Sequence, residues 1–181
     1  MALEFDKQFM QSAEVFHATK RRFELTQGDM KSLIEISINN DRKRARFCAH
    51  LHTDELVHQM FIAHARDTYI RPHKHINRDE SMLVLEGEVD YITFSENGTV
   101  LDVKILGTYE SGKPFFHTIG PDQYHSLIIR SNWLVFLEVA KGPFSKKDNV
   151  MANWSPPDTG SIQGVEYLEN QLEKWTRQAA L

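Results

Sequence analysis

The sequence contains one cysteine, no long apolar run and no excess of positive charge, and each of these excludes a class of protein. A single cysteine cannot form an internal disulfide and is typical of a reducing compartment. No apolar run approaches the roughly 20 residues that a membrane-spanning helix needs. The net charge of -4 argues against a protein that coats nucleic acid or an anionic membrane. We therefore expect a cytoplasmic protein with neither nucleic acid nor a membrane as a partner.

Several signatures of targeting and catalysis are also missing. The first residues carry acidic side chains where a secretory signal needs a basic and then an apolar stretch. There is no P-loop, no Gly-x-Gly-x-x-Gly segment after a strand and no Gly-x-Ser-x-Gly elbow. The sequence therefore predicts neither a nucleotide-binding loop nor the nucleophile of a serine hydrolase.

Hydrophobic periodicity predicts a helix followed by a long series of strands. Thr26 is suited to cap a helix with Asp29 in its first turn, and residues 39–41 end that helix. A short strand is also possible at residues 14–18. From residue 44 the apolar period changes to two, with turn signals between the runs. The strand-like runs cover residues 44–52, 58–65, 68–75, 81–86, 89–95, 99–106, 115–119, 125–129 and 133–139.

Helical periodicity returns at the end of the chain. Apolar residues spaced for one helix face predict a helix over residues 162–179; they are Val165, Leu168, Leu172 and Trp175. Many short strands with no helix between them are typical of a sandwich or barrel. We predict a single mainly-β domain with three parts. They are a strand and helix extension at residues 1–43, a barrel at residues 44–145, and an extended segment with a helix at residues 146–181.

The positions of three of the nine histidines indicate a metal site. Residues two apart in a strand point the same way, so His73 and His75 should project side by side. Glu80 begins the next run after a short turn, and His125 opens a later strand. Three imidazoles and a carboxylate can hold one divalent ion at about 2.0–2.1 Å and leave positions open for water or substrate. Two histidines alone would more commonly lie on the solvated face of a strand. The additional candidate ligands, Glu80 and His125, favour metal binding. Iron, zinc, nickel and manganese all remain open.

The same residues resemble the first motif of the cupin superfamily. That motif reads His-x-His, three or four residues, Glu, six residues, Gly, and it is matched by His73, His75, Glu80 and Gly87. The second motif, Pro-x-Gly-x-x-His-x-x-x-Asn, is matched only in part. His125 is present, but the glycine and proline are displaced and Ile129 stands where asparagine is expected. The resemblance implies a small double-stranded β-helix, or jelly-roll, barrel with an N-terminal and a C-terminal helix.

A closer resemblance, over about residues 14–157, is to the WbuC-type cupin-fold metalloproteins. It is carried by the segments RARFCAH, TYIRPHKH, FLEVAKGPF and ANWSP, at residues 44–50, 68–75, 136–144 and 152–156. Genes of this family often lie among those for surface polysaccharide assembly. The resemblance implies isomerase- or epimerase-like chemistry on a sugar or sugar-nucleotide in surface polysaccharide (O-antigen) biosynthesis. An iron-dependent dioxygenase and a non-catalytic sugar-binding or regulatory cupin module are the alternatives.

Strand parity extends the predicted site beyond the metal ligands. Tyr69 and Arg71 share the parity of His73 and His75, so all four should face the barrel interior. Tyr69 is then a candidate catalytic residue. Arg71 either binds a substrate anion or lies at the rim, because a buried arginine is costly unless it is paired. His117, just before the second-motif turn, is either a general acid–base residue or a hydrogen-bonded residue of the wall.

A second polar strand face begins at residue 44. A charged strand face is by default a solvated one, but the family resemblance makes Arg44, Arg46 and His50 candidates for substrate binding, with guanidinium forks for phosphate or carboxylate. Metal binding by Cys48 and His50 is not favoured, because three histidines and a carboxylate already suffice. The expected ligand is a small polar or anionic molecule. We also predict a homodimer, since the possible strand at residues 14–18 and the apolar face of the terminal helix need to be covered.

Overall fold

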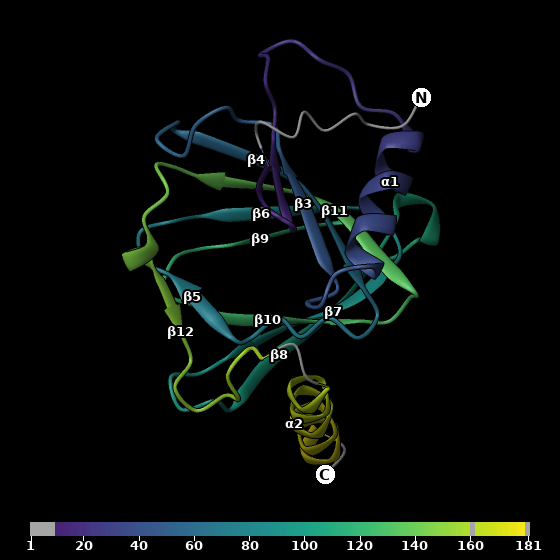
Figure 1. Ribbon diagram of the computed structural model, residues 1–181. Helices are drawn as coiled ribbons and strands as arrows, with labels where there is room; N and C mark the ends of the chain where they lie inside the picture. Colours follow the sequence, from purple (N-terminus) through teal and green to yellow (C-terminus); the bar gives the residue numbers. More distant parts are fainter. Residues whose placement is uncertain (1–9, 160–161, 180–181) are drawn as a thin grey trace.

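The computed structural model describes residues 10–159 and 162–179. Its strands form two sheets that face each other, with α1 and α2 outside them (Figure 1). The first sheet has the spatial order β1 (Met10–Ser12), β2 (Val15–His17), β3 (Arg44–Cys48), β4 (Val57–Ala65), β11 (Trp133–Lys141), β6 (Glu80–Glu86) and β9 (Phe116–Ile119). The second has the order β12 (Asn149–Met151), β5 (His73–His75), β10 (Tyr124–Ile129), β7 (Glu88–Phe94) and β8 (Val100–Gly107).

The strand pairing from β4 to β11 is nested. β7 pairs with β8, β6 with β9, β5 with β10, and β4 with β11, all antiparallel. The chain therefore behaves as one long hairpin that is folded over so that its successive pairs alternate between the two sheets. This is the jelly-roll arrangement. The predicted mainly-β jelly roll with a helix near each end is confirmed.

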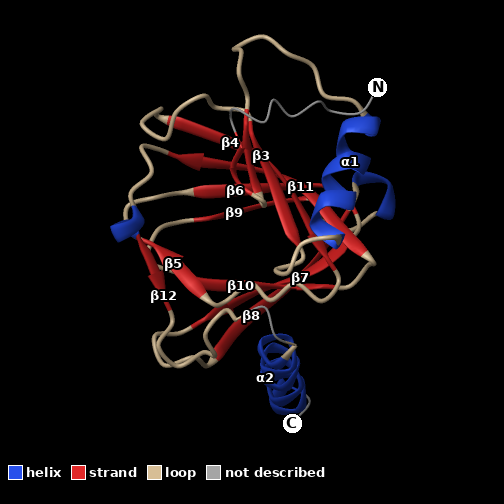
Figure 2. Ribbon diagram, in the orientation of Figure 1, coloured by secondary structure: helices blue, strands red, loops and turns tan. Residues whose placement is uncertain are grey.

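The helix α1 (Gln27–Ile38) covers the outer face of the first sheet (Figure 2). Its start is a capping box, in which Asp29 N donates to Thr26 Oγ1 and Thr26 N donates to an Asp29 carboxylate oxygen at 2.6 Å. Leu33 packs from the helix against Ala45 and Phe47 of β3. Because α1 takes the apolar face of β3, the polar face of that strand must turn toward the space between the sheets.

The helix α2 (Gln163–Ala179) packs against the second sheet. Leu168 is buried in a cluster with Ile92 and Ile128, and an Arg130–Glu169 ion pair of 2.5 Å adds to this contact. The predicted apolar helix face is thus covered by the chain's own sheet and is no reason for a dimer. The homodimer stays a prediction. None of the helices in the described ranges is both long and apolar enough to cross a membrane.

Two of the predicted strands are shorter in the structure. The predicted strand at residues 68–75 is reduced to β5, because Pro72 lacks the N–H that a ladder needs and the segment before it forms other contacts. Among these, Thr68 Oγ1 donates to Lys43 O. The predicted strand at residues 44–52 ends at Cys48. The sequence did not predict β1, β12 or the short 3-10 turns at Tyr109–Ser111 and Lys146–Asp148.

Gly87 joins β6 to β7 with a φ of +91°, and a Cβ there would lie 2.3 Å from Trp133 O. We expect Gly87→Ala to lower the free energy of unfolding by about 2–4 kcal/mol, from left-handed backbone strain together with this clash. Gly112 is the matched control, since its φ is +72° but a Cβ there meets open space. Gly112→Ala should cost only about 1–2 kcal/mol. Urea unfolding of both variants measures the difference, and equal losses would contradict the argument.

Candidate metal centre

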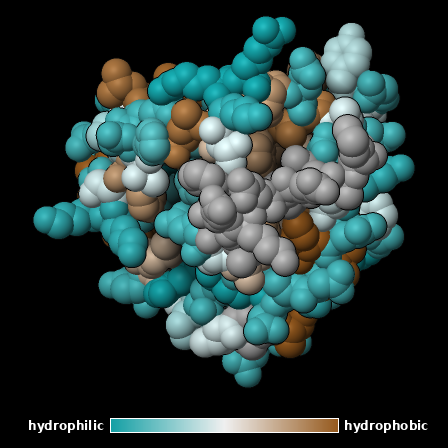
Figure 3. Space-filling view, turned by 45° about the horizontal axis from the view of Figure 1, so that its top comes forward, coloured by the Kyte–Doolittle hydropathy of each residue, from teal (hydrophilic) through white to brown (hydrophobic). Residues whose placement is uncertain are grey.

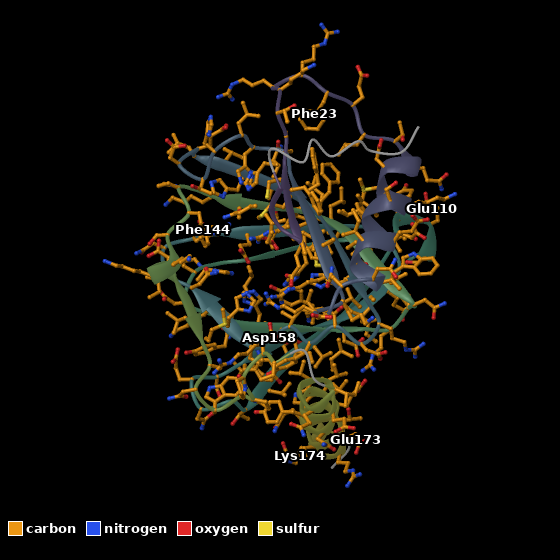
Figure 4. All side chains as sticks on the ribbon, viewed as in Figure 1. Phe23, Glu110, Phe144, Asp158, Glu173 and Lys174 are labelled. Atoms are coloured by element: carbon orange, nitrogen blue, oxygen red, sulfur yellow. The ribbon has the colours of Figure 1, made fainter. Side chains whose placement is uncertain are left out.

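A cavity of about 1010 Å³ lies between the two sheets, and every histidine of the chain except His52 lines it. Side chains fill much of the space between the sheets in Figure 4, where Phe144 and Asp158, two residues of the cavity wall, are labelled. The outer surface differs in character. On the face that Figure 3 shows, hydrophilic residues predominate and hydrophobic ones are scattered. The histidines, with the exception of His52, are thus concentrated inside the jelly roll.

The four predicted metal ligands lie together on this cavity. His73 and His75 come from β5, His125 is the cross-strand partner of His73 on β10, and Glu80 opens β6. The ligand atoms of the three histidines lie within 4.8 Å of one another. Glu80 Oε1 is 3.0 Å from His75 Nε2, and Glu80 Oε2 is 3.6 Å from His125 Nε2. The nested pairing of the jelly roll therefore brings ligands from three strands to one point.

In each of the three imidazoles Nδ1 faces a hydrogen-bond acceptor. The contacts are His73 Nδ1 to Arg71 O at 2.9 Å, His125 Nδ1 to Gln123 O at 3.0 Å and His75 Nδ1 to Asn149 Oδ1 at 2.5 Å. An acceptor at Nδ1 holds the proton there and leaves the lone pair on Nε2, as in metal-ligating histidines. This donor set fits a divalent ion of the iron, zinc, nickel or manganese type.

The charges at the centre are those of an ion pair. Burial by itself raises the pKa of Glu80, but the hydrogen bond and charge of His75 outweigh burial and lower this pKa to about 2. Burial lowers the pKa of His75, yet Glu80 raises it above its usual value. Burial also lowers the pKa of His73 to about 3 and lowers that of His125, so these two imidazoles are neutral. A divalent ion would replace the proton that His75 holds.

Arg78 is a site residue that the sequence analysis missed. Its side chain is buried, its Nε has no hydrogen-bond partner among the described residues, and it lies 3.7 Å from Glu80 Oε1. The guanidinium carbon is 5.8 Å from the centre of the Phe144 ring. It belongs to the turn between His75 and Glu80, for which the sequence analysis made no prediction about side-chain direction. The structure turns it into the cavity.

The polar face of β3 lines the cavity, while the Arg46 side chain on it remains exposed to solvent. Arg44 is neutralised there, with Nε 3.0 Å from Glu14 Oε2 and Nη2 3.3 Å from Asp158 Oδ2. The Arg46 side chain makes no ion pair or hydrogen bond with any residue in the described ranges. His50 is buried on the same wall. The two arginines therefore differ: the charge of Arg44 is paired and that of Arg46 is available.

The parity argument is wrong for Tyr69 and correct for Arg71. Tyr69 is buried under α2, its hydroxyl donates to Pro156 O at 3.0 Å, and it is absent from the cavity wall. Parity fails because the segment before Pro72 is not a strand. Arg71 does line the cavity, but Nη2 donates to Ala152 O at 2.7 Å and Nε to Ser155 Oγ at 3.2 Å. Two of its five N–H groups thus hold the C-terminal segment.

His117 lies on the cavity beside the metal centre. Its Nε2 is buried with no hydrogen-bond partner among the described residues, and its ring centre is 4.3 Å from that of Tyr91. Tyr91 in turn stacks on His125, with ring centres 5.6 Å apart. Burial lowers the pKa of His117 and raises that of Tyr91. Tyr91 therefore links His117 to the candidate ligands, a contact that no local sequence signal predicts.

Glu138 is a second cavity residue that the sequence analysis missed. It lies on β11 and lines the cavity with a half-buried side chain. Burial raises its pKa to about 7, and the negative charge of Glu80 adds to the effect, while Arg78, His75 and Arg46 oppose it. A carboxyl group that titrates near neutrality can both accept and donate a proton. Its position in an apolar strand run gave no signal of this role.

In comparison with known proteins, part of the chain matches the model of a protein family whose function is unknown. Residues 25–106, a little under half of the chain, match the model of a domain of unknown function, DUF6016. No curated protein matches the chain.

Several solved structures resemble parts of the chain. A protein from Shewanella oneidensis is 11% identical with a TM-score of 0.47, over 54% of this chain and 63% of that one. A variant of oxalate decarboxylase from Bacillus subtilis is 17% identical with a TM-score of 0.44, over 54% and 24%. Procruciferin, an 11S globulin from Brassica napus, is 11% identical with a TM-score of 0.41, over 48% and 21%. The matched parts span less than two thirds of those chains, so the fold assignment here rests on the nested strand pairing and not on the likeness.

Proposed function

We propose that this chain is a metal-binding protein of cupin type that acts on a small anionic or polyhydroxylated metabolite. The observation that carries the proposal is the convergence of His73, His75, His125 and Glu80 on the wall of a cavity that also contains unpaired arginine donors. The WbuC-type resemblance supports a narrower form, in which the metabolite is a sugar or sugar-nucleotide in surface polysaccharide biosynthesis and the reaction is an isomerisation or epimerisation.

The size and charge of the cavity support a ligand of this class. Its volume of about 1010 Å³ is at the upper end of the roughly 300–1,000 Å³ that small-molecule sites occupy. Arg78 is buried with an Nε that has no hydrogen-bond partner among the described residues, and buried polar groups without partners are costly until an anion relieves them. Arg46 lines the same cavity from an exposed position. A phosphate or carboxylate group is the natural partner. His50, Arg44 and Arg71 keep a proposed role as further contacts to the ligand.

The residues around the centre can move a proton. A divalent ion held by the four ligands would supply Lewis-acid polarisation of a carbonyl or hydroxyl oxygen. Glu138, on the same cavity, can take a proton from the substrate and return it, since its pKa of about 7 suits both steps. His117 is the alternative proton carrier, with a free and buried Nε2. Proton removal and return is the chemistry of an isomerase or epimerase.

The experiment is an exchange assay in heavy water. Protein reconstituted with iron, zinc, nickel or manganese is incubated with a panel of nucleoside-diphosphate sugars, and NMR records deuterium at carbon together with any new isomer. We expect exchange that Glu138→Gln removes while ligand binding persists. If the iron-loaded protein consumes oxygen and no deuterium enters the substrate, the isomerase proposal is wrong and the iron-dependent dioxygenase takes its place. Tight binding without turnover of any kind would replace it with the non-catalytic module.

The arginines of β3 give a matched test of anion binding. We expect Arg46→Gln to weaken binding of phosphate or a nucleoside-diphosphate sugar to the metal-loaded protein by about tenfold, the worth of one charge-assisted contact. Arg44→Gln should weaken binding less than Arg46→Gln does, because Glu14 and Asp158 already neutralise Arg44. Titration calorimetry measures both. If none of these anions binds while an apolar ligand does, the electrostatic argument is wrong.

A further inference from the structure

Three other side chains with metal-ligating atoms meet on a different wall of the cavity. They are His17, Cys48 and His50, whose ligand atoms lie within 4.8 Å of one another. We propose that they form a second metal site, which takes a zinc-type ion and is separate from the candidate metal centre described above. This inference does not depend on the proposed function, because it concerns a different set of ligands.

The backbone places these three side chains on one side of the first sheet. β2 runs parallel to β3, and His17 is the register partner of Cys48, so both side chains point the same way. His50 follows Cys48 by two residues. The ladder continues past the end of β3, since Ala49 N donates to Gln59 O at 2.8 Å, and this keeps His50 on the side of Cys48. Strand pairing therefore holds His17 and Cys48, and one further backbone hydrogen bond past the end of β3 positions His50.

The hydrogen bonds leave ligating lone pairs unused. His17 Nε2 lies 3.1 Å from Gln11 Oε1, so the proton belongs on Nε2. His17 Nδ1 is then a buried acceptor, and it has no hydrogen-bond partner among the described residues. His50 Nδ1 lies 3.3 Å from both Gln59 O and Gln59 N, so the tautomer is not fixed by these contacts. In the tautomer that donates to the carbonyl, the lone pair on Nε2 is left for a metal ion. Buried polar atoms without partners are uncommon and costly, and a bound cation would satisfy them.

A purely structural cysteine does not explain this arrangement. Free cysteine is often buried as a small apolar side chain, but such a residue does not need two imidazoles beside it. His58 stacks on His50 with ring centres 4.0 Å apart and encloses the cluster further. Burial raises the pKa of Cys48 to about 11 and lowers that of His50 to about 4, so the imidazoles are neutral and an ion must displace the thiol proton. Arg46, whose charge favours the thiolate, and Glu138 also face the thiol.

The donor set determines the class of ion. A thiolate with two imidazoles suits zinc, whereas magnesium, calcium and manganese prefer oxygen ligands. Three protein ligands occupy three positions of a tetrahedral ion and leave the fourth for water or a ligand in the cavity. The candidate metal centre has only nitrogen and oxygen donors. The two sites can therefore be told apart by the presence of sulfur.

Cobalt(II) tests the proposal, because a cobalt–sulfur bond gives an intense charge-transfer band that nitrogen and oxygen ligands do not give. The chain has a single cysteine, so such a band identifies Cys48. We expect the wild-type protein to bind two equivalents of Co²⁺ and to show the band. Cys48→Ser should bind one equivalent and lose the band, and the His73→Ala, His75→Ala double variant should keep it.

The ligand histidines supply the second readout. His17→Ala removes a ligand from a partly exposed position, so the fold should survive, and it should weaken formation of the band by at least about tenfold. His52→Ala is the matched control, because His52 is exposed, lies two residues after His50 and is outside the cavity. It should leave the band unchanged. A wild-type protein without the band at saturating Co²⁺, or a band that His17→Ala does not weaken, would overturn the second site.

Discussion

The His73→Ala, His75→Ala double variant is expected to lose one equivalent of divalent metal and to remain folded. The two imidazoles supply two of the four ligand atoms, and loss of even one outer contact to a metal ligand costs roughly 10–100-fold in affinity. The fold should survive because the main core is apolar and does not depend on the ion, with Val89 and Leu134 fully buried in it. Elemental analysis of protein purified without a tag or chelator gives the metal content, and circular dichroism gives the fold.

The control for this experiment is His117→Ala. His117 lines the same cavity but is outside the ligand cluster, so its loss should leave the metal content unchanged. Glu80→Gln should weaken binding as well, since it removes the carboxylate charge and leaves the side-chain volume. A double variant that binds as much metal as the wild-type protein would show that the four residues are not the ligands.

Acid should destabilise the metal-free protein strongly, and His64 should account for a measurable part of the effect. Burial lowers the pKa of His64 to about 3, with the nearby charge of Arg46 acting in the same direction. His64 is thus neutral in the folded chain at pH 4, whereas in the unfolded chain it takes up a proton below about pH 6.5. The unfolded state therefore binds more protons over this range, and stability falls as the pH falls from about 6.5 toward 3.

One such histidine lowers the free energy of unfolding by about 1.4 kcal/mol for each pH unit, which amounts to about 2–3 kcal/mol between pH 6.5 and pH 4. His64→Phe removes the titrating group and retains a ring to stack on Phe136, whose centre lies 5.6 Å from that of His64. Urea unfolding in the presence of a chelator should give a flatter pH dependence for the variant than for the wild-type chain. Equal slopes for the two proteins would mean that His64 is protonated in the folded state or solvated in it.

The strands and the metal cluster were predictable because their signals are local. Alternation of apolar and polar residues with turns between the runs gave β4, β6, β7, β8, β9, β10 and β11 to within about two residues, as is typical of strong periodic patterns. His73 and His75 share a face for the same reason. Thr26 and Asp29 likewise predicted the N-terminal helix cap that the structure contains. Each of these inferences needs only residues that are close together in the chain.

Strand parity failed where it was extended through Pro72. The segment before β5 leaves the sheet, and so Tyr69 packs under α2 instead of facing the cavity. Proline has no N–H to continue the ladder, and its ring restricts the residue before it. The alternation of residues indicates side-chain direction only within a strand, and the sequence pattern alone does not show where the strand ends.

What the sequence determined by itself was the set of short strands, the two helices and the spacing of the histidine–glutamate motif, because periodicity and motif spacing are properties of neighbouring residues. Only the tertiary structure decided which face of each strand is inside. α1 covers the apolar face of β3 and so turns Arg46 and Cys48 toward the cavity, where they meet Glu138 of β11 and His17 of β2. Periodicity shows that two faces differ, but pairing between distant strands decides which face is buried and which side chains meet.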